Sequence, residues 1–208
     1  SHILVIGAGI VGLSVARAAL RRGHRVTLIE QGEVPNPRAA SSDQHRMIRF
    51  HYGAAEGYTR MVALAFEAWR DLWRELGVEH YAPSGALAVS LRPGDYADET
   101  AKTFGRLQIA HEMLDAGALA RLCPHLDLPF HARGVLAAGG PLFADRIMGD
   151  LARSVRDRGA EILEQTRAVA VDPSAGSLRL ADGRVLGGDL VVVAAGAWLP
   201  DLLPADYG

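Results

Sequence analysis

Residues 3–13 constrain the fold of this chain more than any other stretch. An apolar run over residues 3–6 ends at a glycine, and Gly7, Gly9 and Gly12 form a G-x-G-x-x-G motif at the start of a segment with helical character. In such a turn the first glycine lets the chain leave the strand sharply, the second lets the backbone approach a pyrophosphate, and the third lets the helix pack closely on the strand. The order of strand, tight turn and helix therefore predicts a βαβ unit whose helix start binds phosphates.

An acidic residue follows at the position where this motif carries one. Gly23 is placed to end the helix, and a second apolar strand over residues 25–29 leads directly to Glu30. A carboxylate there accepts hydrogen bonds from ribose hydroxyls and repels a ribose 2′-phosphate, which disfavours NADP. Glycine-rich turns also occur for packing reasons alone, but here the strands, the glycines, the small Ala16 and the acid agree in order and spacing. The motif predicts an adenine dinucleotide and leaves NAD and FAD open.

Composition narrows the class of protein. With 208 residues, 49% of them hydrophobic, the chain can bury a core in one or two compact units. No apolar run reaches the roughly 18 residues needed to span a membrane. Because the fold begins at residue 3, we expect no signal peptide either. A net charge of -2 argues against nucleic acid as a partner.

The single cysteine and the histidines indicate neither a disulfide nor a metal site. Cys123 has no second cysteine to pair with, which suits a reducing compartment, and we expect the protein to be cytoplasmic. A cysteine just before Pro124 is more typical of a small core residue than of a nucleophile. His111, His125 and His131 lie on separate predicted elements without metal-ligand spacing, so we expect no bound metal.

Residues 31–44 and the segment that follows them gather polar side chains. The first part is rich in Pro, Gly, Ser and Asn, which predicts a loop, and loops often carry function. Arg46 and Arg49 follow, and on a helical turn two residues three apart would project from the same side. Two guanidinium groups there suit anions: a flavin phosphate or ring oxygen for one, and a substrate carboxylate for the other. An ordinary solvated basic turn is the alternative, and the residues alone leave both open.

The middle of the chain shows a helical pattern and then a strand. Apolar positions recur at helical spacing over residues 57–76, and Gly77 is placed to end that helix. A small and apolar strand over residues 84–91 marks the start of a second lobe. Two further helices follow, and prolines and a glycine over residues 124–134 predict an irregular connection.

The last strand of the sequence is the most hydrophobic one. Residues 190–195 contain no polar residue, so we expect this strand in the middle of a sheet that is covered on both faces. Gly196 and Trp198 come directly after it, at the carboxyl edge where open α/β sheets bind ligands. Gly196 permits close backbone approach, whereas Trp198 is either a lid residue or simple packing.

Four motifs in collinear order resemble one protein family. They are Ile-Gly-Ala-Gly-Ile-Val-Gly at 6–12, Arg-Met-Ile-Arg at 46–49 with Tyr-Gly at 52–53, Ser-Gly-Ala-Leu at 84–87, and Ala-Gly-Ala-Trp at 195–198. Together they resemble the FAD-dependent amine oxidoreductases grouped with D-amino acid oxidase, most closely the branch of monomeric sarcosine oxidase and N-methyltryptophan oxidase. The resemblance runs from residue 3 to about Leu203. The arginine segment is its most specific part, and it favours a functional role for both arginines.

The resemblance implies an α/β fold with a discontinuous, Rossmann-like FAD-binding domain over residues 1–80 and 141–208. Residues 81–140 would form part of a second, mixed-sheet domain for the substrate. Arg49 would pair with a substrate carboxylate and Arg46 would lie near the flavin, so both are the expected catalytic residues. The residues expected to contact FAD are Gly7, Ala8, Gly9, Ile10, Val11, Gly12, Glu30, Gln31, Ser41, Ser42, Arg46, Met47, Ala168, Ala195, Gly196 and Trp198.

The implied function is oxidation of a secondary amine or amino acid, sarcosine-like in class. A hydride equivalent would pass to flavin N5, the imine product would hydrolyse in water, and oxygen or another electron acceptor would take the electrons. An FAD-dependent dehydrogenase of a 2-hydroxy acid or polyol phosphate is one alternative, and a nucleotide-binding fragment without catalysis is another. Members of the family continue well beyond the match to Trp198, so we expect this chain to be a fragment, truncated at its C-terminus.

Overall fold

The computed structural model describes residues 1–202, so the expected end of the resemblance at Leu203 lies outside the described part. The chain divides into two compact units. Unit 1 comprises Ser1–Gln44 and Phe143–Gly208, and unit 2 comprises His45–Leu142. Among the helices of the described residues, none is both long and apolar enough to cross a membrane.

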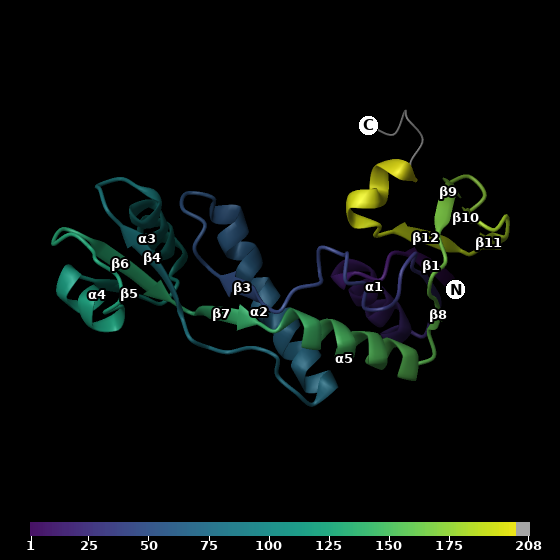
Figure 1. Cartoon of the computed structure of the whole chain (residues 1–208), viewed down its shortest axis with the longest axis horizontal. Helices are drawn as coiled ribbons and strands as arrows, with labels where there is room; N and C mark the ends of the chain where they lie inside the picture. Colours follow the sequence, from purple (N-terminus) through teal and green to yellow (C-terminus); the bar gives the residue numbers. More distant parts are fainter. Residues whose placement is uncertain (203–208) are drawn as a thin grey trace. The chain divides into compact units, whose positions relative to one another are not determined.

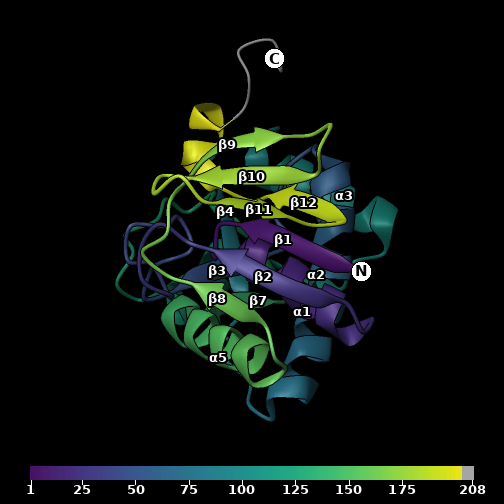
Figure 2. The same cartoon turned by 90° about the vertical axis from the view of Figure 1, so that its right-hand side faces the viewer.

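Unit 1 is built on a parallel sheet with the strand order β12-β1-β2-β8. Figure 2 shows these strands side by side. A second, antiparallel sheet has the order β11-β10-β9. The elements of unit 1 are β1 (His2–Ile6), α1 (Ile10–Arg21), β2 (Arg25–Ile29), α5 (Ala144–Asp157), β8 (Glu161–Leu163), β9 (Ala168–Asp172), β10 (Ser177–Leu180), β11 (Val185–Gly187), β12 (Leu190–Val193) and the 3-10 helix η1 (Gly196–Asp201).

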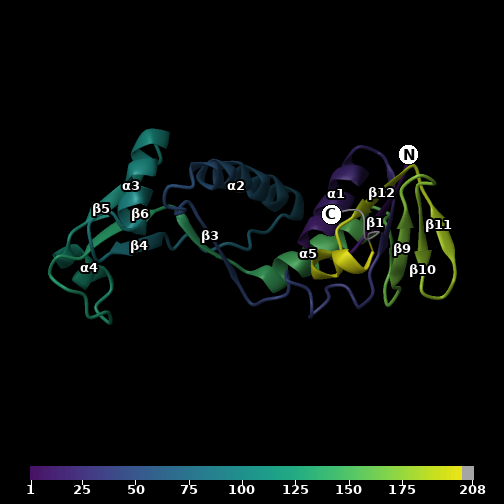
Figure 3. The same cartoon turned by 90° about the horizontal axis from the view of Figure 1, so that it is seen from above.

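Alternate residues of β1 face two different layers. Leu4 and Ile6 belong to a buried cluster with Leu178 and Leu180 of the antiparallel sheet. Val5 faces the other way, toward α1, which packs against α5. Since side chains alternate along a strand, one face of the parallel sheet carries the helices and the other carries the antiparallel sheet. Figure 3 shows these three layers, and they confirm the expected α/β fold with a Rossmann-like core.

The hydrophobic strand near the end of the chain does not lie where we expected it. In the described residues β12 pairs with β1 alone and forms an edge of the parallel sheet, so its predicted place in the middle is wrong. Its side chains Val191 and Val193 are partly buried against the cluster around Leu4. Leu190 is exposed and the three valines after it are only partly buried, so the strand is not fully covered on both faces either.

Unit 2 contains an antiparallel sheet with the order β4-β6-β5 and a separate strand pair, β3-β7 (Figure 1). Phe104 on α3 packs against Val135 of the middle strand β6, and Leu119 on α4 packs against Leu136. The two helices therefore cover opposite faces of this sheet. The elements of unit 2 are β3 (Arg46–Arg49), α2 (Glu56–Leu76), β4 (Ala86–Ser90), α3 (Tyr96–Leu107), β5 (His111–Leu114), α4 (Ala116–Leu122), β6 (Arg133–Ala137) and β7 (Gly139–Leu142).

The limits of unit 2 differ from the expected lobe over residues 81–140. Unit 2 begins at His45 because β3 pairs in antiparallel register with β7, from Arg46 opposite Leu142 to Arg49 opposite Gly139. The strand β6 starts inside a stretch that we expected to be irregular. Its residue 134 is a glycine, and a Cβ there would come within 2.7 Å of a side-chain atom of α4. The glycine thus allows close helix packing and does not break the strand.

Candidate functional site

The turn between β1 and α1 requires glycine at two of its three motif positions. Gly7 has φ +98°, and a Cβ on it would overlap the carbonyl oxygen of Ala194. A Cβ on Gly12 would overlap the carbonyl oxygen of Gly7. At Gly9, by contrast, a Cβ would meet only Ser41 Oγ, at 3.3 Å. The first and third glycines therefore permit close backbone packing, and the second leaves space beside the backbone, as the motif predicts.

A side chain from the loop over residues 31–44 caps the start of α1. Gly9 is the N-cap residue, and the Leu13 N–H makes the first intrahelical bond to its carbonyl. The Ile10 N–H donates to Ser41 Oγ at 2.9 Å. The remaining N–H groups of the first turn have no intrahelical acceptor, as at any helix start, and they carry the positive end of the helix dipole.

Glu30 is buried at the end of β2, with 6% of its surface exposed. The Ala8 N–H donates to its Oε2 at 2.9 Å, and its Oε1 accepts from the Gly32 N–H and from Asn36 Nδ2, each at 2.9 Å. A carboxylate offers about four acceptor positions, so one position on Oε2 is left over. The acid thus fixes the glycine turn and the loop as well as offering an acceptor for a ligand.

These elements surround a cavity of about 460 Å³. Its size lies in the range of small-molecule and cofactor sites. It lies at the carboxyl ends of β1, β2 and β12, the edge where open α/β sheets bind ligands. The expected site residues that line it are Gly7, Gly9, Ile10, Val11, Glu30, Gln31, Ser41, Ala168, Ala195, Gly196 and Trp198.

Three expected residues adjoin this cavity without lining it. Ala8 holds Glu30 through its N–H, Gly12 packs under Gly7, and the Ser42 N–H donates to the Ala39 carbonyl at 2.9 Å. Sequence reasoning missed other residues that line the cavity: those of the loops show no periodicity and no motif, and those inside the motifs and strands were not singled out as contacts. They are Asn36, Arg38, Ala39, Ala40, Thr166, Arg167, Ala194, Ala197, Asp201 and Leu202, with Ile6 and Ile29 from the strands.

The expected arginines lie on unit 2, and they lie on a strand. Arg46 and Arg49 end β3, where residues three apart point to opposite faces, so the expectation for a helical turn does not apply. Arg46 and Met47 are exposed, whereas Arg49 is half-buried. Because all three belong to unit 2, their role at the cofactor stays a prediction.

Arg49 is held by three neighbours. Its Nη1 donates to the His51 carbonyl and, at 2.9 Å, to Tyr96 Oη. Its guanidinium carbon lies 4.9 Å from the centre of the Tyr52 ring, a cation–π distance. Tyr96 also donates its hydroxyl to the His51 carbonyl. In the described part of the chain, Nε and Nη2 of Arg49 make no hydrogen bond, so this edge of the fork is available to an anion.

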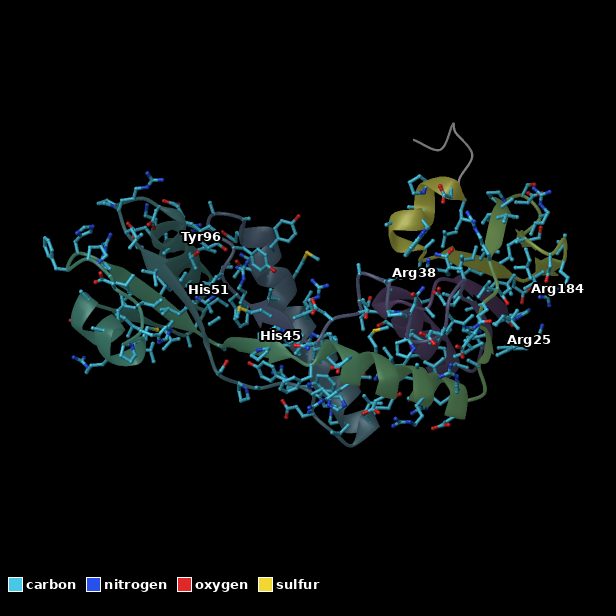
Figure 4. The ribbon with its side chains drawn as sticks, in the orientation of Figure 1. Arg25, Arg38, His45, His51, Tyr96 and Arg184 are labelled. Carbon is cyan, nitrogen blue, oxygen red and sulfur yellow. The ribbon has the colours of Figure 1, made fainter. Side chains whose placement is uncertain are left out.

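His51 is the buried titratable group of this cluster, with 2% of its surface exposed. Its Nε2 lies 3.0 Å from the Val135 carbonyl and so donates to it, while Nδ1 has no partner among the described residues. Burial lowers the pKa of His51 below its ordinary value; the bond to Val135 opposes this, and the charge of Arg49 adds to it. His51 and Tyr96 are labelled in Figure 4.

The parallel βαβ unit, its glycine turn and the cavity at the strand ends define a dinucleotide-binding protein of the Rossmann class. The chain belongs to the DAO family of FAD-dependent oxidoreductases, whose family model matches residues 2–207. The resemblance drawn from the motifs is thereby confirmed, and FAD is the cofactor of this family. No cluster of metal-ligating side chains occurs within residues 1–202.

Individual relatives agree with this family. Human peroxisomal sarcosine oxidase is 27% identical over 201 residues, which cover 96% of this chain and 51% of the relative. N-methyl-L-tryptophan oxidase of Citrobacter koseri is 25% identical, with 97% and 55% covered. The solved structure of NikD, an amino acid oxidase, superposes with a TM-score of 0.85 at 25% identity, covering 97% of this chain and 52% of that one. The chain spans about half the length of these relatives.

We predict that Gly12→Ala destabilises unit 1. The added methyl group would overlap the Gly7 carbonyl oxygen, and this oxygen belongs to backbone that cannot move freely. Overpacking of this kind costs about 1–3 kcal/mol of unfolding free energy, measured by urea denaturation. Gly149→Ala on α5 is the matched control, because a Cβ there meets nothing within 4 Å and alanine favours the helix. Equal stability of the two variants would contradict this account.

We predict that unit 2 loses stability as the pH falls below about 6.5, the ordinary pKa of histidine. Because the folded-state pKa of His51 is lowered, the unfolded chain binds more protons in the window just below 6.5. The midpoint of urea unfolding should therefore fall between pH 7.5 and pH 5.5, and this fall should be smaller in His51→Gln than in the original chain. Replacement of the exposed His45 by Gln is the control and should preserve the difference. An unchanged difference in His51→Gln would refute the role of this histidine.

Proposed function

We propose that unit 1 binds FAD in the cavity at the carboxyl ends of β1, β2 and β12. The buried Glu30 carries this proposal, because it joins the glycine turn to the loop and keeps an acceptor position for a ribose hydroxyl. Gly7, Gly9 and Gly12 would form the cradle of the diphosphate, next to Ser41 at the start of α1. The backbone at Ala168 would meet the adenine, and Ser42, Arg46, Gly196 and Trp198 would approach the diphosphate or flavin.

For the whole protein we propose oxidation of a secondary amine or amino acid that carries a carboxylate. The relatives named as sarcosine and N-methyl-L-tryptophan oxidases support this substrate class. Arg49 would bind the carboxylate through Nε and Nη2, since Nη1 is already held by Tyr96 and the His51 carbonyl. When bound, FAD supplies a flavin N5 that accepts a hydride equivalent from the carbon beside the amine, and the imine then hydrolyses.

The proposal includes the partners and the location. The substrate would be a small molecule, the electrons would pass to oxygen or to another acceptor, and the protein would be cytoplasmic. The net charge of -2 supports a partner other than nucleic acid.

The test is an anaerobic titration of the FAD-loaded protein with candidate substrates. The readout is the flavin absorbance at about 450 nm. Sarcosine, N-methyl amino acids and D-amino acids should bleach this band. If only 2-hydroxy acids or polyol phosphates bleach the band, the substrate is an alcohol and the proposed amine substrate is wrong. A protein that takes up no FAD would defeat the proposal altogether.

We predict that Arg49→Lys weakens the binding of carboxylate substrates. A lysine keeps the charge but loses the planar fork, so the substrate concentration at half-maximal reduction should rise about 10–100-fold. The matched control is Arg60→Gln, because Arg60 lies exposed on α2 of the same unit and pairs with Glu56. Equal half-saturation in Arg49→Lys and the original protein would exclude the carboxylate contact.

A further inference from the structure

Four charged side chains line the cavity of unit 1: Glu30, Arg38, Arg167 and Asp201. Two of them form a pair, because Arg167 Nη2 lies 3.8 Å from Asp201 Oδ2. Glu30 is a buried negative charge held by N–H groups. Arg38 is exposed at the cavity wall, and its guanidinium has no ion pair or hydrogen bond with any residue in the described part of the chain.

The backbone of Arg38 is fixed although its side chain is exposed. Its N–H donates to Asn36 Oδ1 at 2.9 Å, and Asn36 is buried, with 4% of its surface exposed. The Nδ2 of Asn36 donates to Glu30 Oε1 at 2.9 Å. A continuous chain of hydrogen bonds thus runs from Ala8 in the glycine turn through Glu30 and Asn36 to Arg38.

The charges around the cavity favour a cationic contact for a bound diphosphate. A dinucleotide brings a diphosphate with about two negative charges, and the start of α1 offers the equivalent of only about half a positive charge. Glu30 adds a negative charge near that helix start, and Arg167 is partly neutralised by Asp201. A guanidinium fork matches the geometry of phosphate oxygens, and Arg38 is the lining arginine that has no carboxylate partner among the described residues.

We propose that Arg38 is a cationic contact for the diphosphate of the dinucleotide. The proposal rests on the proposed binding of FAD to unit 1, and it assigns a role to a residue outside the glycine motif. Figure 4 shows Arg38 close to η1, whereas Arg25 and Arg184 lie on the other side of unit 1. Arg25 begins β2, at the amino-terminal end of the strand, whereas the cavity lies at the carboxyl end. Arg184 pairs with Asp182 at 2.7 Å in a hairpin turn.

The experiment measures binding of FAD, ADP and adenosine to the chain and to Arg38→Gln by isothermal titration. Arg38→Gln should raise the Kd for FAD and for ADP about tenfold and leave the Kd for adenosine unchanged, because adenosine has no phosphate. The fall in ADP affinity between low and high salt should also be smaller in Arg38→Gln, since one charge contact is lost. The Kd of Arg38→Lys for ADP should lie between those of the original chain and Arg38→Gln, because lysine keeps the charge but loses the fork.

Arg184→Gln is the matched control, and it should bind all three ligands as the original chain does. Equal Kd values for ADP in the original chain and Arg38→Gln would overturn the assignment of Arg38 and leave the FAD site intact. An equal loss for ADP and adenosine would also overturn it, because the effect would then lie outside the diphosphate. If the original chain binds neither FAD nor ADP, the proposed function itself fails.

Discussion

The contact on which unit 1 depends is the close approach of α1 to the end of β1. Gly12 packs on the carbonyl oxygen of Gly7 more closely than any side chain allows, and Gly7 in turn lies against the carbonyl of Ala194. Three backbone segments therefore meet at one point: the glycine turn, the helix start and the end of β12. This packing brings the first N–H groups of α1 to the edge of the sheet, where the cavity lies.

A buried carboxylate would destabilise this region if its charge were not satisfied. Glu30 is satisfied by N–H groups from both sides, Ala8 in the turn and Gly32 with Asn36 in the loop. The same hydrogen bonds order a loop that its own sequence leaves irregular. The loop then places Ser41 on the start of α1, so one acid fixes both walls of the cavity.

The sequence predicted the βαβ unit and about half of the residues that line the cavity, because the glycines, the strand ends and Glu30 act through local geometry. It failed where tertiary pairing decides. The expectation that Arg46 and Arg49 project from the same side of a helical turn was wrong, because both residues lie on a strand that pairs with β7. Likewise, nothing local marks Asn36 as buried, because a polar residue between two prolines is typical of an exposed turn.

Arg49 and Arg38 differ in how firmly their side chains are held before a ligand binds. Arg49 is half-buried, with Nη1 fixed by Tyr96 and the His51 carbonyl, so a ligand would find its fork already oriented. A small carboxylate makes few contacts and gains most from such preorganisation, because it has little binding energy to spend on ordering a side chain. Arg38 is fixed only through its backbone. A dinucleotide makes many contacts along the cavity, so it can order an exposed guanidinium and still bind. The difference in order between the two side chains therefore matches the difference in size between the two proposed ligands.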